Sequence, residues 1–507
     1  MKKITRLSLC GAVRTFKGGY KFVNFDGQPK DILEGLKIPL RVSIPLMQGF
    51  GGEADCLVRP LDKVSAGQII GHSEEGVSSP VHSTINGVVE EVKRVNYFKR
   101  DCLMVSIKGD GSPEYQKVPG YSPNWQGLSE EEIERVLYLS GVTALDREGI
   151  PTRYRSSIIQ PQDVQSLIVH GIGSEPYNIS PEISLGGKNT LNLIEGIKIL
   201  HKIMPKAVVY LALNSQREKT LEEVNKLTSG MDWLMVQRLE AKYPQGYDEM
   251  LVPTILGEKF PYGYSAANIG IVVLNIQAVL QAYEAVVEGK PLIERTIALC
   301  GPAFKEPMHI KARIGMALAD IAADRIRPGV TPRFVLNGLL TGKELKDLSL
   351  PIDKTYSQII ALPEDRERKF LVFLRPGFNR DSYSHTFLAK LFPEKKKYCG
   401  TNKHGEERPC ISCGYCQEVC PVGIIPHLLS KYVQRGIIDE TLMNLRIFNC
   451  IECGLCSYVC PSKIPLAKHI KDGQEKLTVQ GCDRNQCILP YFNNLKGIEE
   501  YRGAKQL

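Results

Sequence analysis

The stretch that decides the fold of this chain is Cys410-Ile-Ser-Cys413-Gly-Tyr-Cys416-Gln-Glu-Val-Cys420-Pro421, and it recurs as Cys450-Ile-Glu-Cys453-Gly-Leu-Cys456-Ser-Tyr-Val-Cys460-Pro461. Three cysteines at this spacing wrap one face of a cubane [4Fe–4S] cluster, and the fourth, which precedes a proline, reaches the other cluster. The repeat therefore predicts two clusters close enough for an electron to pass between them. The predicted ligands of one cluster are Cys410, Cys413, Cys416 and Cys460, and those of the other are Cys450, Cys453, Cys456 and Cys420.

The same spacing argues against zinc and against disulfides. Zinc sites usually combine two C-x-x-C pairs across a long gap, rather than two quartets that each end in Cys-Pro. Disulfides are rare in large intracellular chains, because thiols stay reduced there. Gly414 and Gly454 suit a tight turn that brings backbone N–H groups to the cluster sulfurs. The residues between the motifs read as helices, which resembles the helical ferredoxin domains of larger redox enzymes.

The chain has fifteen cysteines, so seven lie outside the two quartets. Cys482 and Cys487 form a close pair that could be redox-active, could supply extra cluster ligands or could be buried or free thiols. Cys399 has no assigned role. We expect the scattered cysteines to be small buried side chains; they are Cys10, Cys56, Cys102 and Cys300.

Composition indicates an ordinary soluble globular protein of several domains, with 507 residues, 43% hydrophobic and 24% charged. The most apolar stretch, 269–287, is interrupted by polar residues, so no membrane span is expected. The first residues lack the long apolar run of an export signal, which favours a cytoplasmic protein, with docking on the cytoplasmic face of a membrane complex left open. A net charge of +8 suits acidic partners such as small ferredoxins, or a merely lysine-rich surface, and no basic run suggests nucleic acid.

The region up to residue 118 is rich in β-branched residues and turn signals. Asn86-Gly87 between apolar residues predicts a hairpin. The segment 57–95 resembles the barrel-sandwich fold of biotinyl and lipoyl carrier domains. Those carriers present a lysine on the exposed hairpin, and the corresponding stretch here, SSPVHST, has none. A structural or docking barrel is therefore expected.

After the linker KVPGYSPNWQGLSEEE (117–132), strands alternate with helices, which predicts a mostly parallel sheet. Ser129 and Glu132 form a predicted capping box at the start of the first helix. We expect a barrel-sandwich, an α/β unit, a smaller β-containing unit, a connecting region, the two-cluster domain and a tail. Their expected bounds are 1–118, 129–260, 261–350, 351–400, 401–480 and 481–507.

This order of units resembles the C subunit of Rnf electron-transport complexes over most of the chain. The resemblance rests on FKGGYK, IPLMQGFGGEADCLVRPLDKVSAGQIIG, LIVHGIGSEPYNIS, LEAKYPQG, NIQAVLQAYEAVVEGKPLIERTIALCG and the cluster motifs. The middle is similar to the flavin- and NADH-binding subunit of complex I, whose ligand-binding β-grasp domain the smaller unit resembles. The A subunit of sodium-pumping NADH:quinone reductase shares the front architecture but lacks the clusters. The implied fold is multidomain α/β with an N-terminal β barrel-sandwich, a central complex I-like domain, a β-grasp-like unit and a C-terminal helical two-[4Fe–4S] domain.

The resemblance also implies a flavin site, but its motifs are altered. The family's phosphate-binding loop, G-x-G-G-x-x-F-P-T, is represented by GVTALDREGIPTRYRSS, where Gly149, Pro151 and Thr152 remain. Its N-x-x-E-C-E-P motif reads HGIGSEP, and its G-G-P-M-M-G reads NGLLTG. We hypothesise that the FMN/NADH site is degenerate and FMN is absent. The alternative is that a different flavin pose is rebuilt by the remaining candidates, which are Gly149, Glu175, Tyr177 and Lys242.

The expected function is that of an electron-transfer subunit in an Rnf-like complex, not catalytic on its own. Expected partners are other subunits of a redox complex, either membrane subunits or a soluble flavoenzyme, and a ferredoxin. One alternative is an FMN-containing NADH dehydrogenase or ferredoxin:NAD oxidoreductase subunit. A second alternative is an assembly scaffold with structural clusters.

Overall fold

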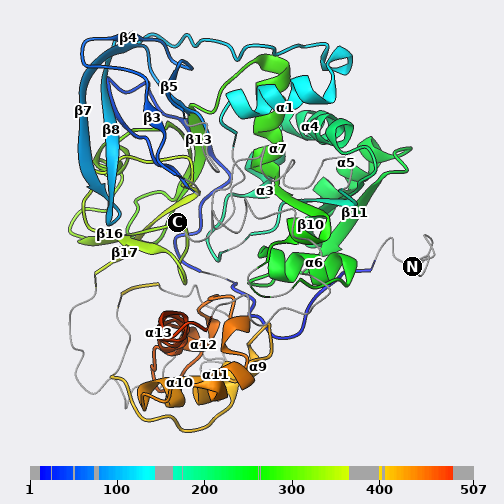
Figure 1. Ribbon diagram of the computed structural model, residues 1–507, viewed down its shortest axis with the longest axis vertical. Coiled ribbons are helices and arrows are strands. Elements are labelled where there is room, and N and C mark those ends of the chain that lie inside the picture. The colour runs from blue at the N-terminus through cyan, green and yellow to red at the C-terminus, as the bar shows by residue number, and fades with distance from the viewer. Residues whose placement is uncertain are drawn as a thin grey trace.

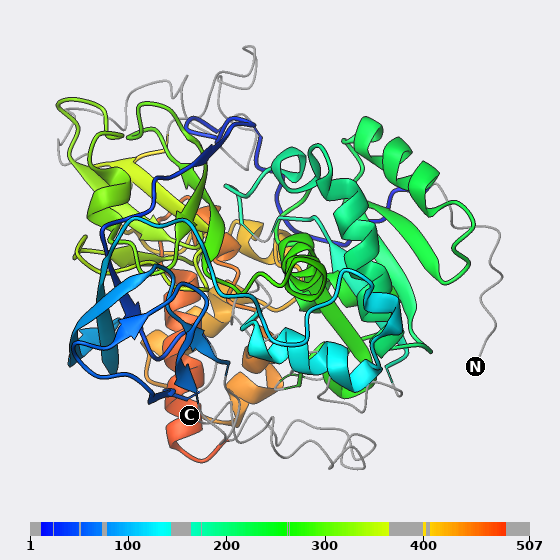
Figure 2. The ribbon, with the colours of Figure 1, turned by 90° about the horizontal axis from the view of Figure 1, so that it is seen from above.

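The computed structural model describes residues 12–23, 25–49, 52–72, 79–142, 164–173, 175–260, 262, 264–364, 399–401 and 406–482. The helices that follow the cysteine motifs form a separate domain, drawn in orange and red below the rest in Figure 1. Above it stand three units. Seen from above, the N-terminal barrel and a six-stranded sheet occupy one side, and the central α/β unit occupies the other (Figure 2).

Two small antiparallel sheets form the N-terminal barrel. One has the order β2-β8-β7-β4 and the other the order β3-β5-β6. Alternating apolar side chains, among them Ile44, Val89 and Ile107, fill the space between them. The strands are β2 (Arg41–Pro45), β3 (Asp55–Cys56), β4 (Lys63–Val64), β5 (Ile69–His72), β6 (Val81–His82), β7 (Gly87–Tyr97) and β8 (Arg100–Gly109).

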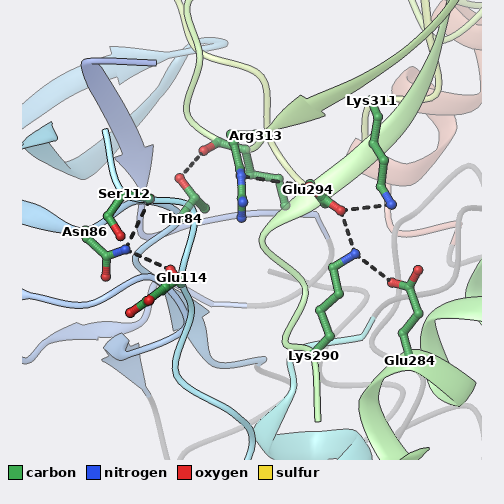
Figure 3. Close-up of polar contacts among 10 residues, drawn as sticks. Thr84, Asn86, Ser112, Glu114, Glu284, Lys290, Glu294, Lys311 and Arg313 are labelled. Atoms are coloured by element: carbon green, nitrogen blue, oxygen red, sulfur yellow. Dashed lines mark hydrogen bonds and ion pairs between the residues drawn. The ribbon is translucent and has the colours of Figure 1, made fainter. Parts of the chain in front are cut away.

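The prediction of a hairpin at Asn86-Gly87 is wrong. β6 and β7, on either side of it, belong to different sheets. The hairpin that forms joins β7 to β8 through Phe98 and Lys99, both with positive φ (50° and 66°). Asn86 instead accepts a hydrogen bond from the N–H of Ala66 (2.9 Å) and donates to the carbonyl of Glu114 (2.7 Å; Figure 3). Its short amide satisfies backbone groups at a sheet corner, which is the other common use of asparagine in turns.

The central unit contains the expected parallel sheet, in the order β11-β10-β9-β12. Leu167 and Val169 of β9 pack into a core with α1, α4 and α7 on one face, and Ile168 packs toward α6 on the other. The strands are β9 (Ser166–His170), β10 (Val208–Asn214), β11 (Leu234–Leu239) and β12 (Ile271–Asn275). The helices are α1 (Glu130–Leu139), α3 (Pro181–Leu185), α4 (Asn189–Ile203), α5 (Glu218–Thr228), α6 (Asp248–Leu256) and α7 (Ile276–Tyr283), with short helical turns at Trp125–Gly127, Ala266–Ile269 and Glu284–Glu288.

The capping box at the start of α1 is confirmed. The N–H of Glu132 donates to the Ser129 hydroxyl (3.2 Å), and the Ser129 N–H donates to the Glu132 carboxylate (2.7 Å). The expected division at residue 260 does not match the sheet pairing, because β12 lies beyond it yet pairs with β9. The apolar sequence of β12 suggests the start of a new unit, because the sequence of a buried parallel strand does not show which strand it pairs with.

A mixed sheet of order β1-β14-β13-β17-β15-β16 occupies the place expected for the smaller β-containing unit. It draws β1 from the N-terminal region and β17 from the stretch expected to be a connector. The short helix α8 (Leu318–Ala322) packs against its core. The strands are β1 (Leu33–Gly35), β13 (Glu294–Cys300), β14 (Met308–Arg313), β15 (Pro332–Leu336), β16 (Lys343–Leu345) and β17 (Gln358–Pro363).

A partly buried ion network joins the end of α7 to this mixed sheet (Figure 3). The Glu294 carboxylate lies 2.5 Å from the Lys290 ammonium and 2.9 Å from that of Lys311, and Lys290 also reaches Glu284 at 3.4 Å. Burial opposes ionisation of Glu294, but Lys290 and Lys311 outweigh it and lower the pKa of Glu294 to about 2. Beside it, the Thr84 hydroxyl of the barrel donates to the Ile314 carbonyl (2.6 Å), so the barrel is fixed to the same sheet.

Over 406–482 the regular elements are helices, as expected for the segment between the motifs. They are α9 (Tyr415–Glu418), α10 (Pro426–Gln434), α11 (Glu440–Asn444), α12 (Leu455–Tyr458) and α13 (Leu466–Val479), with a 3₁₀ turn at Ile447–Asn449. Val433 of α10 packs with Ile470 and Leu477 of α13 in one core. Among all described helices, none is long and apolar enough to cross a membrane.

Residues 12–23, which we call the N-terminal strap, run between the cluster domain and the units above it (dark blue in Figure 1). The Arg14 N–H donates to the Arg238 carbonyl (2.9 Å), and the Tyr20 N–H donates to that of Tyr243 (3.0 Å). The Gly19 N–H donates to the carbonyl of Val419, in the first cysteine motif (2.8 Å). The strap therefore connects the central unit to the cluster domain.

Candidate iron–sulfur centre

The two cysteine motifs adopt the same local backbone. The residue before the second cysteine, Ser412 or Glu452, has φ of +55° in both motifs. Its N–H points back to the first cysteine, with N–Sγ distances of 3.4 Å from Ser412 to Cys410 and from Glu452 to Cys450. The following glycines, Gly414 and Gly454, also have positive φ (79° and 76°), and they begin the short helices that carry the third cysteine.

One pocket collects three cysteines of the first motif and the last cysteine of the second. Its lining includes Cys410, Cys413, Cys416 and Cys460, together with His427. Burial, and then the neighbouring thiols of Cys413, Cys460 and Cys410, raise the pKa of Cys416 to about 11. Like charges raise one another's pKa only when they are close. The structure thus brings together the four residues that the sequence assigns to one cluster.

The complementary set surrounds Cys456. Burial raises the pKa of Cys456 well above its usual value, and the neighbouring thiols that add to this are, in order, Cys453, Cys450 and Cys420, then Cys416. Cys420 and Cys450 also border the same hydrophobic core beneath α10 and α13. Cys416 appears in both surroundings, so the two sets lie next to each other.

These donors fit iron–sulfur clusters better than single ions. Four thiolates about 2.3 Å from one zinc ion would stand within about 4 Å of one another. Within the described part of the chain, no three Cys, His, Asp or Glu side chains converge closely enough to hold one metal ion. A cubane spreads its four ligands over four iron atoms and needs wider spacing. Neighbouring thiols also need a cationic centre if all of them are to lose their protons.

The two sets differ in their surroundings. Ile411 is 67% exposed and Cys413 is exposed as well. Their counterparts in the second motif, Ile451 and Cys453, are each only 8% exposed, because they pack against the central unit. We therefore call the set with Cys413 the outer quartet and the set with Cys453 the inner quartet.

Of the residues expected at a flavin site, Gly149 lies outside the described residues, with most of its loop. Tyr177 is fully buried, and its hydroxyl donates to the Asp26 carbonyl. The Lys242 ammonium donates to the Phe16 carbonyl of the strap (3.0 Å) and lies 4.9 Å from the Phe16 ring centre. Burial lowers the pKa of Lys242, which Glu240 partly offsets. Tyr177 and Lys242 therefore make contacts with the N-terminal region.

Glu175 lies where the central unit, the NGLLTG segment and the second cysteine motif meet. It is 7% exposed. Its carboxylate accepts hydrogen bonds from the Leu340 N–H (3.3 Å) and the Thr341 hydroxyl. A Cβ at Gly338 would lie 2.6 Å from the Glu175 carboxyl carbon, so the carboxylate occupies the space that this glycine leaves. Two of the three altered motifs are therefore in direct contact.

Two residues that sequence reasoning missed complete this region. The hydroxyls of Tyr243 and Tyr247 lie 2.9 Å apart, and each is 3.4 Å from Glu175. The Tyr243 hydroxyl is also 2.6 Å from the carbonyl oxygen of Cys453. Burial, and then Glu175 and Tyr247, raise the pKa of Tyr243 far above its usual value, so its hydroxyl keeps its proton. Two tyrosines spaced by four residues in LEAKYPQGY were a signal for a shared buried face, but not for this partner.

The remaining cysteines take different places. Cys102 and Cys300 are fully buried, as expected, whereas Cys56 is only partly buried. Cys482 is partly buried at the edge of the core that also includes Cys420 and Cys450. Its partner in the sequence, Cys487, and Cys10 lie outside the described residues.

Comparison with known proteins confirms the resemblance drawn from the sequence. Family models match the RnfC barrel sandwich hybrid domain at residues 14–112, the Nuo51 FMN-binding domain at 138–284 and a 4Fe-4S dicluster domain at 404–464. The C subunit of the proton-translocating ferredoxin:NAD(+) oxidoreductase complex of Clostridium ljungdahlii is 27% identical over 84% of this chain and 86% of its own length. The C subunit of the ion-translocating oxidoreductase complex of Yersinia pseudotuberculosis is 27% identical over 92% of this chain, which spans 63% of that relative. A solved NAD+-reducing [NiFe]-hydrogenase matches at 12% identity with a TM-score of 0.44, covering 69% of this chain and 62% of that one.

Proposed function

We propose that this chain, which is related along most of its length to the C subunits of ion-translocating oxidoreductase complexes, is the electron-transfer subunit of an Rnf-like complex. The outer quartet and the inner quartet would each hold one [4Fe–4S] cluster. Such clusters supply one-electron transfer without substrate chemistry of their own. Its partners are the other subunits of that complex, and it would reach the membrane through them as a peripheral protein on the cytoplasmic face.

The observation that carries the proposal is the crossed grouping of the cysteines. Cys460 lines the pocket of the first motif, and Cys420 lies beside Cys456 of the second. Crossed ligation places two clusters next to each other, which is what a relay needs and an isolated structural metal does not. The protein's own contribution is to hold eight thiols in two adjacent sets and to bury Cys453 and Cys456 of the inner set.

The outer quartet is the face on which we expect a redox partner to bind. Ile411 and Cys413 are exposed there, while the equivalent Ile451 and Cys453 are covered by the central unit. Electron exchange between proteins needs a short path, which an exposed ligand provides. A chain of net charge +8 suits a small acidic iron–sulfur protein such as a ferredoxin, or another subunit with such a domain, as the partner.

For the flavin site, we propose that the altered motifs no longer bind FMN. Two polar donors of the altered NGLLTG segment, the Leu340 N–H and the Thr341 hydroxyl, are bonded to the Glu175 carboxylate. A second anion beside this buried carboxylate would be repelled. The second candidate function, an FMN-containing NADH dehydrogenase subunit, is favoured by the match to the FMN-binding family model at 138–284.

The test is the cofactor content of the full chain purified without oxygen. We expect about eight iron and eight sulfide per chain, and no flavin after incubation with FMN. Absence of iron in protein that is otherwise folded would contradict the relay. Stoichiometric FMN together with the iron, and NADH-driven dye reduction, would favour the dehydrogenase instead. The Glu175→Gln variant removes the repelling charge, so we expect it to bind FMN more strongly than wild type does.

A further inference from the structure

The inner quartet receives a hydrogen bond from the central unit. The Tyr243 hydroxyl oxygen lies 2.6 Å from the carbonyl oxygen of Cys453, across 210 residues of sequence. Tyr243 is 5% exposed and Cys453 is 8% exposed, so water does not screen the contact. Cys453 occupies the same place in its motif as Cys413, which is open to solvent.

The direction of each hydrogen bond follows from counting protons. A carbonyl has no proton, so the one between Tyr243 and Cys453 belongs to Tyr243, which must therefore donate. With that proton used, we assign the 2.9 Å contact between the two hydroxyls to a bond from Tyr247 to Tyr243, because the other acceptor of the Tyr247 proton, the Glu175 carboxylate, is farther away at 3.4 Å. The result is a chain from Tyr247 to Tyr243 to the Cys453 carbonyl. Such chains polarise each successive bond and strengthen the last one.

From this chain we infer that Tyr243 sets the reduction potential of the inner cluster and makes it easier to reduce than it would be without the hydroxyl. The inference rests on the proposed function. A carbonyl oxygen beside a cluster contributes negative potential, which opposes the added electron. A donor on that oxygen withdraws part of the negative charge and so favours the reduced state. The outer cluster, beside exposed Cys413, is tuned by water instead.

Tyr243 is placed for this role by residues that do not belong to either quartet. Tyr247, 2% exposed, holds the hydroxyl from one side, and Glu175 lies 3.4 Å away on another. The Phe22 ring packs edge-on against Tyr243, with ring centres 5.7 Å apart. This packing leaves the ring little freedom, so the donor stays aimed at the carbonyl.

The experiment is a redox titration of the full chain, loaded with iron and sulfide, and followed by electron paramagnetic resonance. A soluble paramagnetic relaxing agent identifies the outer cluster, because it broadens the signal of the exposed site more strongly. In Tyr243→Phe we expect the midpoint potential of the inner cluster to become more negative and that of the outer cluster to stay in place. Tyr247→Phe keeps the last bond but removes its polarisation, so we expect a smaller shift in the same direction.

The matched control is Tyr97→Phe, which removes a buried tyrosine hydroxyl of the barrel that lies 2.9 Å from the Asp353 carboxylate and 3.1 Å from the Pro351 carbonyl, and that contacts neither quartet. We expect it to leave both potentials unchanged. If the midpoint potential of each cluster is the same in wild type, Tyr243→Phe and Tyr247→Phe, this inference is overturned and the proposed function still stands. Wild-type protein that binds no iron would overturn both.

Discussion

Ile411 and Ile451 occupy the same position in the two cysteine motifs, yet Ile411 is 67% exposed and Ile451 is 8% exposed. Ile451 packs into a core that includes Tyr247 and Met250 of the central unit. A single repeated sequence thus serves one buried contact and one open surface. The difference comes from what the rest of the chain places over each copy.

This pair gives a first prediction. Ile451→Ala removes buried side-chain volume between two units and should cost about 2–5 kcal/mol of stability, whereas Ile411→Ala should cost less than about 0.5 kcal/mol. The loss of visible cluster absorbance on heating measures the first effect. Ile411→Ala should instead slow electron exchange with a reduced ferredoxin. Equal melting temperatures for the two variants would contradict the burial difference.

The crossed grouping of cysteines gives a second prediction. Cys460→Ala and Cys410→Ala lie in different motifs but line one pocket, so both should remove the same cluster. Iron should fall from about eight to about four per chain in each variant. The remaining paramagnetic resonance signal should be the same in both, and it should differ from the signal that remains in Cys450→Ala. If Cys460→Ala instead matched Cys450→Ala, each motif would hold its own cluster.

The ion network around Glu294 gives a pH dependence. Its pKa is lowered from 4.5 to about 2 in the folded chain, so it contributes stability that is present above about 4.5 and lost as the pH falls toward 2. We expect the unfolding midpoint in denaturant to fall over this range. Glu294→Gln should flatten that part of the curve and lower stability at neutral pH. Lys311→Met is the companion variant, because it removes one cationic partner of the same carboxylate. A curve for Glu294→Gln that is parallel to wild type below pH 4.5 would show that the network is not responsible.

The strap gives a fourth prediction. Gly18 has φ of +79°, and a Cβ there would lie 2.7 Å from the Cys420 carbonyl oxygen. Gly111 has φ of +83° and open space around it. Both Gly→Ala variants carry the cost of the left-handed backbone, roughly 1–2 kcal/mol, but only Gly18→Ala meets a clash. We expect Gly18→Ala to lose more stability and to release iron faster to a chelator. Iron release at the same rate in both variants would mean that the strap does not support the cysteine motif.

Local patterns predicted the local structure well. The alternation of apolar strands and helices predicted the parallel sheet, and Ser129 with Glu132 predicted a capping box, because each depends on neighbours in sequence. The contact of Tyr243 with Cys453 could not be predicted in this way, since neither residue's surroundings in the sequence contain the other. The hairpin prediction at Asn86-Gly87 was wrong for a related reason. The Asn86 amide bonds to Ala66 and Glu114, which are distant in the chain, and so it does not form the turn that Asn-Gly favours.

The bond from the Gly19 N–H to the Val419 carbonyl has a consequence for how the protein is made. Synthesis proceeds from the N-terminus, so the strap leaves the ribosome long before the motif that it will contact. The barrel and the central unit have their own cores and can form during translation. The bonds of Arg14 and Tyr20 to Arg238 and Tyr243 can form once the central unit is complete, but the bond of Gly19 must wait for residue 419. This last contact therefore marks a chain that has been translated through the first cysteine motif, and a product that stops earlier holds the strap on the central unit alone.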